Sequence, residues 1–170
     1  GIVPALDYLT ASNRKSLGDA VPAFEDGRLN AVGKDVVVIG GGDTAMDCVR
    51  TAIRQKAKSV SCLYRRDKAN MPGSQREVQN AEEEGVVFKW LSAPQAFLGD
   101  DKVSAVQAQS IHLGQPDATG RQVPQTIEGS SHDMPADLVI KALGFDPEDM
   151  PKMFGDDGLR VSKWGTISID

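Results

Sequence analysis

The segment at residues 36–47 constrains the fold of this chain more than any other, and it has the sequence VVVIGGGDTAMD. It joins a short run of β-branched residues to a glycine turn and then to an amphipathic stretch. The turn has the spacing G-x-G-x-x-A, which Gly40, Gly42 and Ala45 provide. β-Branched runs favour buried strands, and apolar residues recur at helical spacing after the turn. The segment therefore predicts a strand, a tight turn and a helix in direct succession.

Each residue of this turn has a physical role if a dinucleotide binds here. Gly40 lets the chain turn sharply out of the strand, Gly42 lets the backbone approach a pyrophosphate, and Ala45 lets the helix pack closely on the strand. The first helical turn offers free N–H groups and the positive end of the helix dipole to phosphates. A purely structural glycine turn is the alternative. The predicted cofactor-binding residues of this segment are Gly40, Gly41, Gly42, Asp43, Thr44 and Ala45.

A pair of arginines follows the next apolar run and indicates which dinucleotide binds. A site specific for NAD usually has an acidic side chain here, which bonds the ribose 2′-hydroxyl and would repel a 2′-phosphate. This chain has Arg65 and Arg66 instead. A guanidinium holds a phosphate through two parallel N–H···O bonds, so the pair favours NADPH over a merely solvated charged turn. Tyr64 either stacks on the adenine or fills core.

Composition limits the classes of protein to consider. The chain has 170 residues, of which 40% are hydrophobic and 25% charged, as in an ordinary globular domain. Its formal net charge of −5 argues against a general nucleic-acid binder. No apolar run approaches the ~18 residues of a membrane-spanning helix, and no signal peptide is visible. These features predict a cytoplasmic protein that does not bind membranes.

The cysteines and histidines do not form a recognisable metal site or catalytic site. The two cysteines, Cys48 and Cys62, provide no disulfide framework and suit a reducing cytosol. Each is expected to fill core as a small apolar side chain. His112 and His132 are isolated in the sequence. We assign no role to these four residues and predict no metal ligand.

The order of the remaining elements predicts an α/β fold. Residues 1–17 contain a short helix and residues 19–33 form a connection. Ser74 and Glu77 have the spacing of a capping box, in which each side chain bonds a free backbone N–H at a helix start, and Gly85 suits the position after the helix. The expected strands lie at residues 35–39, 59–64 and 86–91, and the expected helices at residues 43–56 and 75–84.

The pattern changes after residue 92. Strand-like runs at residues 96–98, 103–113 and 122–127 have no helical period and predict an inserted antiparallel meander. The apolar run at residues 137–143 is expected to return to the parallel sheet, and Gly144 either lets the strand end approach the cofactor or makes a plain turn. Residues 159–170 have the pattern of a hairpin. The predicted fold is a Rossmann-like three-layer α/β fold with a parallel sheet and this β-meander.

Four segments together resemble one known family. They are VVIGGGDTAMDC at residues 37–48, YRRD at 64–67, MPGS at 71–74 and ALGF at 142–145. They closely resemble the NADPH-binding domain of bacterial glutamate synthase small (beta) subunits, in the pyridine-nucleotide:flavin oxidoreductase superfamily. The resemblance covers nearly the whole chain.

The resemblance implies a function that this chain performs only as part of a larger protein. In that family the domain is inserted into an FAD-binding domain; NADPH reduces FAD, and electrons pass through [4Fe-4S] clusters to a large subunit that makes glutamate. Residues 1–32 would then lead in from an FAD domain, residues 33–145 would bind NADPH and residues 146–170 would return. The FAD and cluster sites would lie outside this chain, which alone would be inactive and contain no catalytic residue. By the same resemblance, residues 40–45 would hold the pyrophosphate and Arg65 and Arg66 the 2′-phosphate.

Other functions remain open at this point. The domain resembles those of other flavin/iron–sulfur oxidoreductases, such as dihydropyrimidine dehydrogenase. A self-sufficient NADP-dependent dehydrogenase would need a proton-transfer site, and the only two tyrosines, Tyr8 and Tyr64, are badly placed for it. A noncatalytic NADP(H)-sensing module is the third possibility. The electron acceptor, the oligomeric state and the NADPH affinity do not follow from the sequence.

Overall fold

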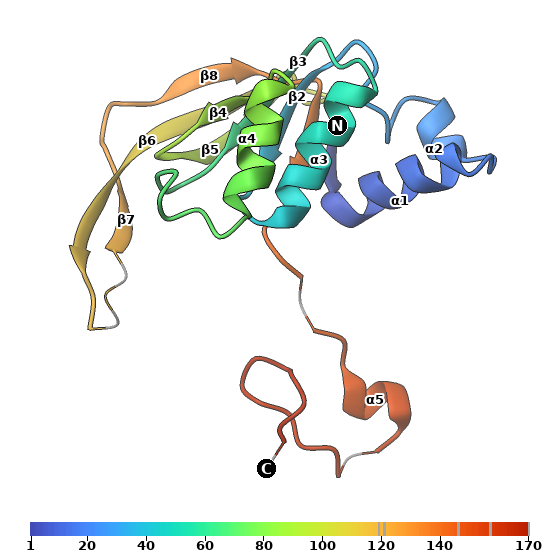
Figure 1. The fold of residues 1–170 in the computed structure, drawn as a ribbon, viewed down its shortest axis with the longest axis vertical. Helices are drawn as coiled ribbons and strands as arrows, with labels where there is room; N and C mark the ends of the chain where they lie inside the picture. Colours follow the sequence, from blue (N-terminus) through green and yellow to red (C-terminus); the bar gives the residue numbers. More distant parts are fainter. Residues whose placement is uncertain (119, 121, 146, 157, 170) are drawn as a thin grey trace.

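The chain folds into three layers, shown in Figure 1. The structure is a computed structural model, and it describes residues 1–118, 120, 122–145, 147–156 and 158–169. A layer of helices covers one face of a parallel sheet, and an antiparallel sheet covers the other. The helices of the first layer are α1 (Ala5–Ser16), α3 (Asp43–Arg54) and α4 (Gln75–Glu83). The predicted three-layer α/β fold is confirmed.

The central sheet is parallel throughout and has the order β1-β9-β2-β3-β4. The central strands β2 and β9 are buried on both faces, so their sequences are almost continuously apolar. In β2, Val36 and Val38 pack toward the helices, whereas Val37 and Ile39 pack toward the antiparallel sheet. The strands are β1 (Ile2–Pro4), β2 (Asp35–Ile39), β3 (Ser59–Leu63), β4 (Val87–Lys89) and β9 (Leu138–Lys141).

The inserted meander forms the third layer. Its long strand β6 (Ala105–Pro116) pairs in antiparallel fashion with β5 (Ser92–Leu98), β7 (Gln122–Thr126) and β8 (His132–Pro135). The far half of β6 and β7 make a two-stranded ribbon that extends beyond the layers (Figure 1). Val106 and Met134 are buried against the parallel sheet. The antiparallel meander is therefore confirmed, with β8 as a strand that the pattern did not predict.

The N-terminal segment differs from its prediction. Residues 2–4 form β1, an edge strand beside β9, before α1 begins. Pro4 is compatible with an edge strand, because proline lacks only the backbone N–H donor, and an edge strand has one side without a partner strand to bond. Tyr8 on α1 is fully buried, and its hydroxyl donates to Gln55 Oε1 at 3.1 Å. The segment is thus part of the sheet and of the helical layer, and the predicted boundary at residues 32–33 stays a prediction.

Two short helices also lie outside the expected elements. Helix α2 (Pro22–Glu25) occupies the predicted connection, and α5 (Met150–Phe154) lies apart from the three layers (Figure 1). Near the C-terminus, Val161 and Ile167 form an antiparallel bridge, and the Ser168 N–H donates to the Arg160 oxygen at 2.9 Å, so the predicted hairpin is present in a short form. Residue 170 of that prediction lies outside the described residues.

The predicted capping box is wrong. Ser74 is the N-cap of α4, but its side chain makes no capping hydrogen bond. The Glu77 carboxylate instead accepts a hydrogen bond from Arg50 on α3, and it also accepts one from Asn80. The Glu77 side chain, which the local pattern assigned to the cap, therefore forms an ion pair with the neighbouring helix instead. Gly85 does follow the helix with φ +99°, as expected.

Candidate functional site

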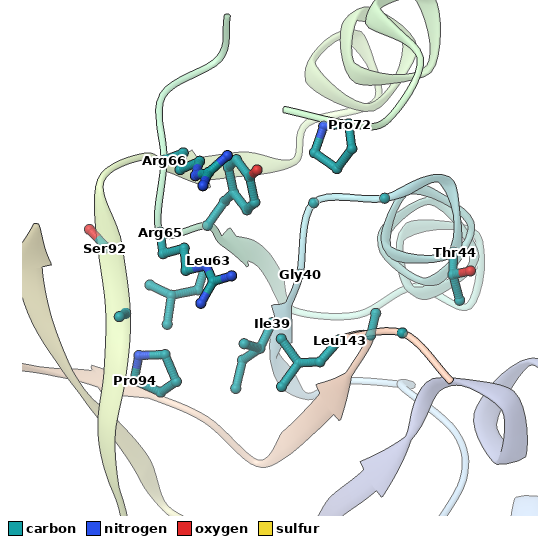
Figure 2. A pocket seen from close by; sticks show the side chains of 16 residues that line it. Ile39, Gly40, Thr44, Leu63, Arg65, Arg66, Pro72, Ser92, Pro94 and Leu143 are labelled. Atoms are coloured by element: carbon teal, nitrogen blue, oxygen red, sulfur yellow. The ribbon is translucent and has the colours of Figure 1, made fainter. Parts of the chain in front are cut away.

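A pocket of about 620 Å³ lies at the carboxyl ends of β2, β3 and β9, and the start of β5 forms its opposite wall (Figure 2). Ligands of open α/β sheets bind at this edge. Figure 2 shows Arg65, Arg66, Ser92 and Pro94 on one side of the pocket, and Leu143 and Thr44 on the other. Eight of the ten predicted cofactor residues line it, namely Gly40, Gly41, Gly42, Thr44, Tyr64, Arg65, Arg66 and Gly144.

The two others lie beside the pocket rather than on its wall. Ala45 is fully buried and packs in the core under α3. Asp43 is exposed, and its Oδ1 accepts a hydrogen bond from the Ser74 N–H at 2.8 Å. Ala45 thus has the packing role expected for a small residue at that position, and Asp43 contacts a loop.

The first two glycines of the turn have no room for a side chain. Gly40 has φ +145°, and a Cβ there would lie 2.1 Å from the backbone oxygen of Ala142 at the end of β9. A Cβ on Gly41 would lie 2.3 Å from the ring of Tyr64. The turn is therefore packed between the end of β9 and the Tyr64 ring.

Gly42 is different from its neighbours. It is the N-cap of α3, with φ −89° and ψ 176°, and no described atom lies within 4 Å of a Cβ built on it. No described side chain caps the helix start either. Gly42 and Thr44 thus border open pocket space at the positive end of a helix dipole. Such a helix start is suited to an anion.

The two arginines at the end of β3 have different surroundings. Arg65 is exposed, whereas Arg66 is half-buried and its Nη2 donates to the backbone oxygen of Gln122 in β7 at 3.4 Å. The Nε of Arg66 is buried and has no hydrogen-bond partner among the described residues. A buried donor without a partner is uncommon in folded proteins.

Part of the wall was not predicted from the sequence. Pro72 lines the pocket because its loop docks on the glycine turn: the Gly73 N–H donates to the Gly41 oxygen at 2.9 Å. Residues 92–94 line it because the Ser92 N–H donates to the Tyr64 oxygen at 3.0 Å. Pro72 belongs to the MPGS segment, so the sequence resemblance could have indicated that it lies near the cofactor. No sequence pattern indicated residues 92–94, because only the fold brings them to the pocket.

The four residues without an assigned role lie away from the pocket lining. Cys48 and Cys62 are buried, and burial raises the pKa of both thiols to about 12. Thiols that remain protonated are poor nucleophiles and metal ligands. His112 and His132 lie exposed on β6 and β8. In the described part of the chain, no group of three or more His, Cys, Asp or Glu is placed to hold a metal ion.

The described residues also contain no helix that is long and apolar enough to span a membrane.

The fold and its pocket define a Rossmann-like α/β domain, and T. acidophilum thioredoxin reductase shares this fold, with a TM-score of 0.63 at 21% identity. The family model of the pyridine nucleotide-disulphide oxidoreductases matches residues 5–170, and the chain belongs to that family. The expected superfamily is therefore confirmed.

Curated relatives and solved structures agree with this assignment. The chain is 67% identical to the glutamate synthase [NADPH] small chain of Azospirillum brasilense, over 99% of its own length but only 35% of that protein. It is 47% identical to the putative oxidoreductase AegA of Escherichia coli, over 100% of its length and 26% of that protein. The chain thus spans about a third of these relatives or less. Mycobacterium tuberculosis FprA in complex with NADPH has the same fold, with a TM-score of 0.70 at 17% identity, over 88% of this chain and 46% of that one.

Proposed function

We propose that this chain binds NADPH in the pocket and delivers its hydride to FAD held elsewhere in the same protein, as part of a glutamate synthase small subunit. The observation that carries the proposal is that a glycine turn at a helix start and an arginine pair line one pocket. The two features match the two charged ends of the ligand, the pyrophosphate and the 2′-phosphate. The names of two related proteins, a glutamate synthase [NADPH] small chain and a putative one, support the choice of NADPH.

The residues present fit this ligand. The open space at Gly42 leaves room for a pyrophosphate beside the start of α3, where Thr44 also lies. Arg65 and Arg66 would hold the 2′-phosphate through charge-assisted hydrogen bonds. Ile39 and Leu63 provide apolar wall between these ends. Backbone donors are thus available at one end of the cavity and guanidinium groups at the other.

The chemistry itself comes from the cofactors. When bound, the nicotinamide supplies a hydride, and no protein acid or base is needed for its transfer to a flavin. The task of this chain is to orient the ligand. Leu143 and Gly144 form an exposed rim on the pocket, and Leu143 is 71% exposed. This rim is where we propose that the FAD domain approaches.

The further steps of the proposal concern the whole protein. The [4Fe-4S] clusters and the large subunit that makes glutamate would receive the electrons outside this chain. The relative AegA bears the name of a putative oxidoreductase and not of a glutamate synthase. The final acceptor therefore has to be determined by experiment.

The test uses the full-length natural protein. Calorimetric titration with NADPH and with NADH should show the tighter binding for NADPH. Anaerobic addition of NADPH should then bleach the absorbance of the bound flavin. Equal affinity for the two nucleotides would contradict the role of the arginines, and an unchanged flavin spectrum would contradict hydride delivery to FAD. Formation of glutamate from 2-oxoglutarate and glutamine, compared with other acceptors, decides the final step.

A further inference from the structure

The loop at residues 70–74, called here the docking loop, is attached to the glycine turn at two points. The Gly73 N–H donates to the Gly41 oxygen at 2.9 Å, and the Ser74 N–H donates to Asp43 Oδ1 at 2.8 Å. We propose that Asp43 is a positioning residue that holds the docking loop on the glycine turn and thereby sets the affinity for NADPH. This inference rests on the function proposed above.

The position of Asp43 needs an explanation because its charge is unfavourable for that function. A carboxylate in the first turn of α3 repels phosphates bound at the same helix start. The helix dipole favours an acidic residue there, which is one reason for its presence. The hydrogen bond with Ser74 is a second reason for the presence of Asp43, because it joins the helix to a loop residue 31 positions away in the sequence. Asp43 thus connects the helix start to the loop that supplies Pro72 to the pocket.

The docking loop also fixes one particular peptide unit. The Gly41 oxygen, which the Gly73 N–H bonds, belongs to the same planar peptide as the Gly42 N–H. Fixing the direction of this oxygen therefore fixes the direction of the Gly42 N–H, on a residue that lines the pocket. The loop approaches closely, since a Cβ on Gly73 would lie 3.0 Å from the Gly41 oxygen.

The second side of the turn is held by Tyr64. Its ring lies against Gly41, and its hydroxyl donates to the Asn70 oxygen at 3.0 Å. Three successive glycines at residues 40–42 have much backbone freedom, which binding would otherwise have to remove. A turn held from two sides is already ordered before the ligand arrives. Loss of the Asp43 bond should therefore weaken ligand binding and leave hydride transfer at saturation unchanged.

Two substitutions remove the same bond from opposite ends. Asp43→Ala removes the acceptor. Ser74→Pro removes the donor, and Ser74 has φ −55°, which suits proline. The matched controls are Asp43→Asn, which retains an Oδ1 acceptor without the charge, and Ser74→Ala, which retains the N–H. All are made in the full-length protein. The measurements are the NADPH dissociation constant, the rate of flavin reduction at saturating NADPH, and hydrogen–deuterium exchange of peptides covering residues 70–78 without ligand.

The expected result is a rise of about tenfold in the NADPH dissociation constant for Asp43→Ala and for Ser74→Pro, as for loss of one ordinary hydrogen bond. The double variant should be no worse than either single one. Both controls should stay within about threefold of the natural protein, and the saturated rate should not change. Exchange in the docking loop should become faster in Asp43→Ala and not in Asp43→Asn.

Three outcomes would overturn the inference. Tighter NADPH binding in both Asp43 variants would mean that Asp43 acts only as a repelling charge. An unchanged dissociation constant with a lower Tm would mean that it serves only stability, and unchanged exchange in Asp43→Ala would mean that it does not hold the loop. If the natural protein binds no NADPH, the proposed function fails, whereas the exchange measurement still decides whether Asp43 holds the loop.

Discussion

The two ends of the pocket are built in different ways. The glycine end, residues 40–42, consists of backbone that is packed against Ala142 and Tyr64 with no room for side chains at its first two positions. The arginine end consists of two long side chains at the end of β3, one exposed and one half-buried. The conformation of the glycine end is fixed by packing within the fold, whereas the arginine end consists of side chains that extend from the end of a strand.

This difference predicts how the two ends respond to substitution. At the glycine end, a residue that packs against other backbone cannot change without affecting stability. At the arginine end, the exposed Arg65 side chain can be removed with little effect on the free energy of unfolding, and removal of the half-buried Arg66 loses one long hydrogen bond to Gln122. Gly42 lies between these cases, because it belongs to the glycine turn but faces open space. The following substitutions test this comparison.

Gly40→Ala should have the largest effect. Alanine rarely adopts φ +145°, and its Cβ would lie 2.1 Å from the Ala142 oxygen. We expect a loss of about 3–5 kcal/mol in the free energy of unfolding, out of roughly 5–15 kcal/mol for a typical domain. Urea denaturation followed by circular dichroism measures it. A loss below about 1 kcal/mol would mean that the end of β9 adjusts easily and that the glycine end is less rigid than its contacts indicate.

Gly42→Val should separate binding from folding. The residue has φ −89°, which valine adopts, and its Cβ would meet no described atom within 4 Å. We expect a cost of about 1–2 kcal/mol in stability and loss of NADPH binding, since the side chain would occupy the proposed pyrophosphate position. The measurement is the Tm without ligand and its rise with NADPH. A folded variant with an undiminished rise would place the phosphates elsewhere.

Replacing both arginines by alanine should change the preference for NADPH but not the fold. Loss of charge-assisted hydrogen bonds worth about 1.5–3 kcal/mol weakens NADPH binding roughly ten- to a hundredfold. NADH binding should change by less than about threefold, because NADH has no 2′-phosphate. Calorimetry with both nucleotides gives the ratio. Arg66→Lys is the matched control, since it retains the charge but not the planar fork. Equal losses for the two nucleotides would argue that the arginines contact another part of the ligand.

The parts of the fold predicted from sequence are those with a strong local pattern. The predicted strand at residues 35–39 coincides with β2, because β-branched residues buried on both faces have no other suitable structure. The predicted helix at residues 43–56 ends two residues earlier, at Arg54. Strand β8, by contrast, contains only Met134 as a buried apolar residue and owes its structure to pairing with β6.

The candidate site shows the same division. The glycine turn and the arginines were recognised from residue type and spacing, and they do line one pocket. Pro72 and residues 92–94 were not assigned to it, because tertiary hydrogen bonds bring them there. The capping box failed for a related reason: Arg50, on another helix, pairs with Glu77. Local patterns therefore identified the residues with special chemistry, whereas the surrounding wall needed the fold.

Tyr64→Phe should have the smallest effect and shows how the two ends are connected. Tyr64 immediately precedes the arginines, while its ring lies on Gly41, so it belongs to both ends. The substitution removes the bond from the hydroxyl to the Asn70 oxygen, which is exposed, but retains the ring. We expect a loss of about 0.5–1 kcal/mol in stability, a Tm lower by about 1–4 °C, and NADPH binding within about threefold of the natural protein. Differential scanning calorimetry measures the stability and the Tm, and calorimetric titration measures the binding.

Tyr64→Ala, which also removes the ring, should weaken binding further because the glycine turn then loses its support on one side. If Tyr64→Phe weakens binding as strongly as Tyr64→Ala, the hydroxyl and not the ring connects the two ends, and the rigidity of the glycine end depends on the docking loop alone.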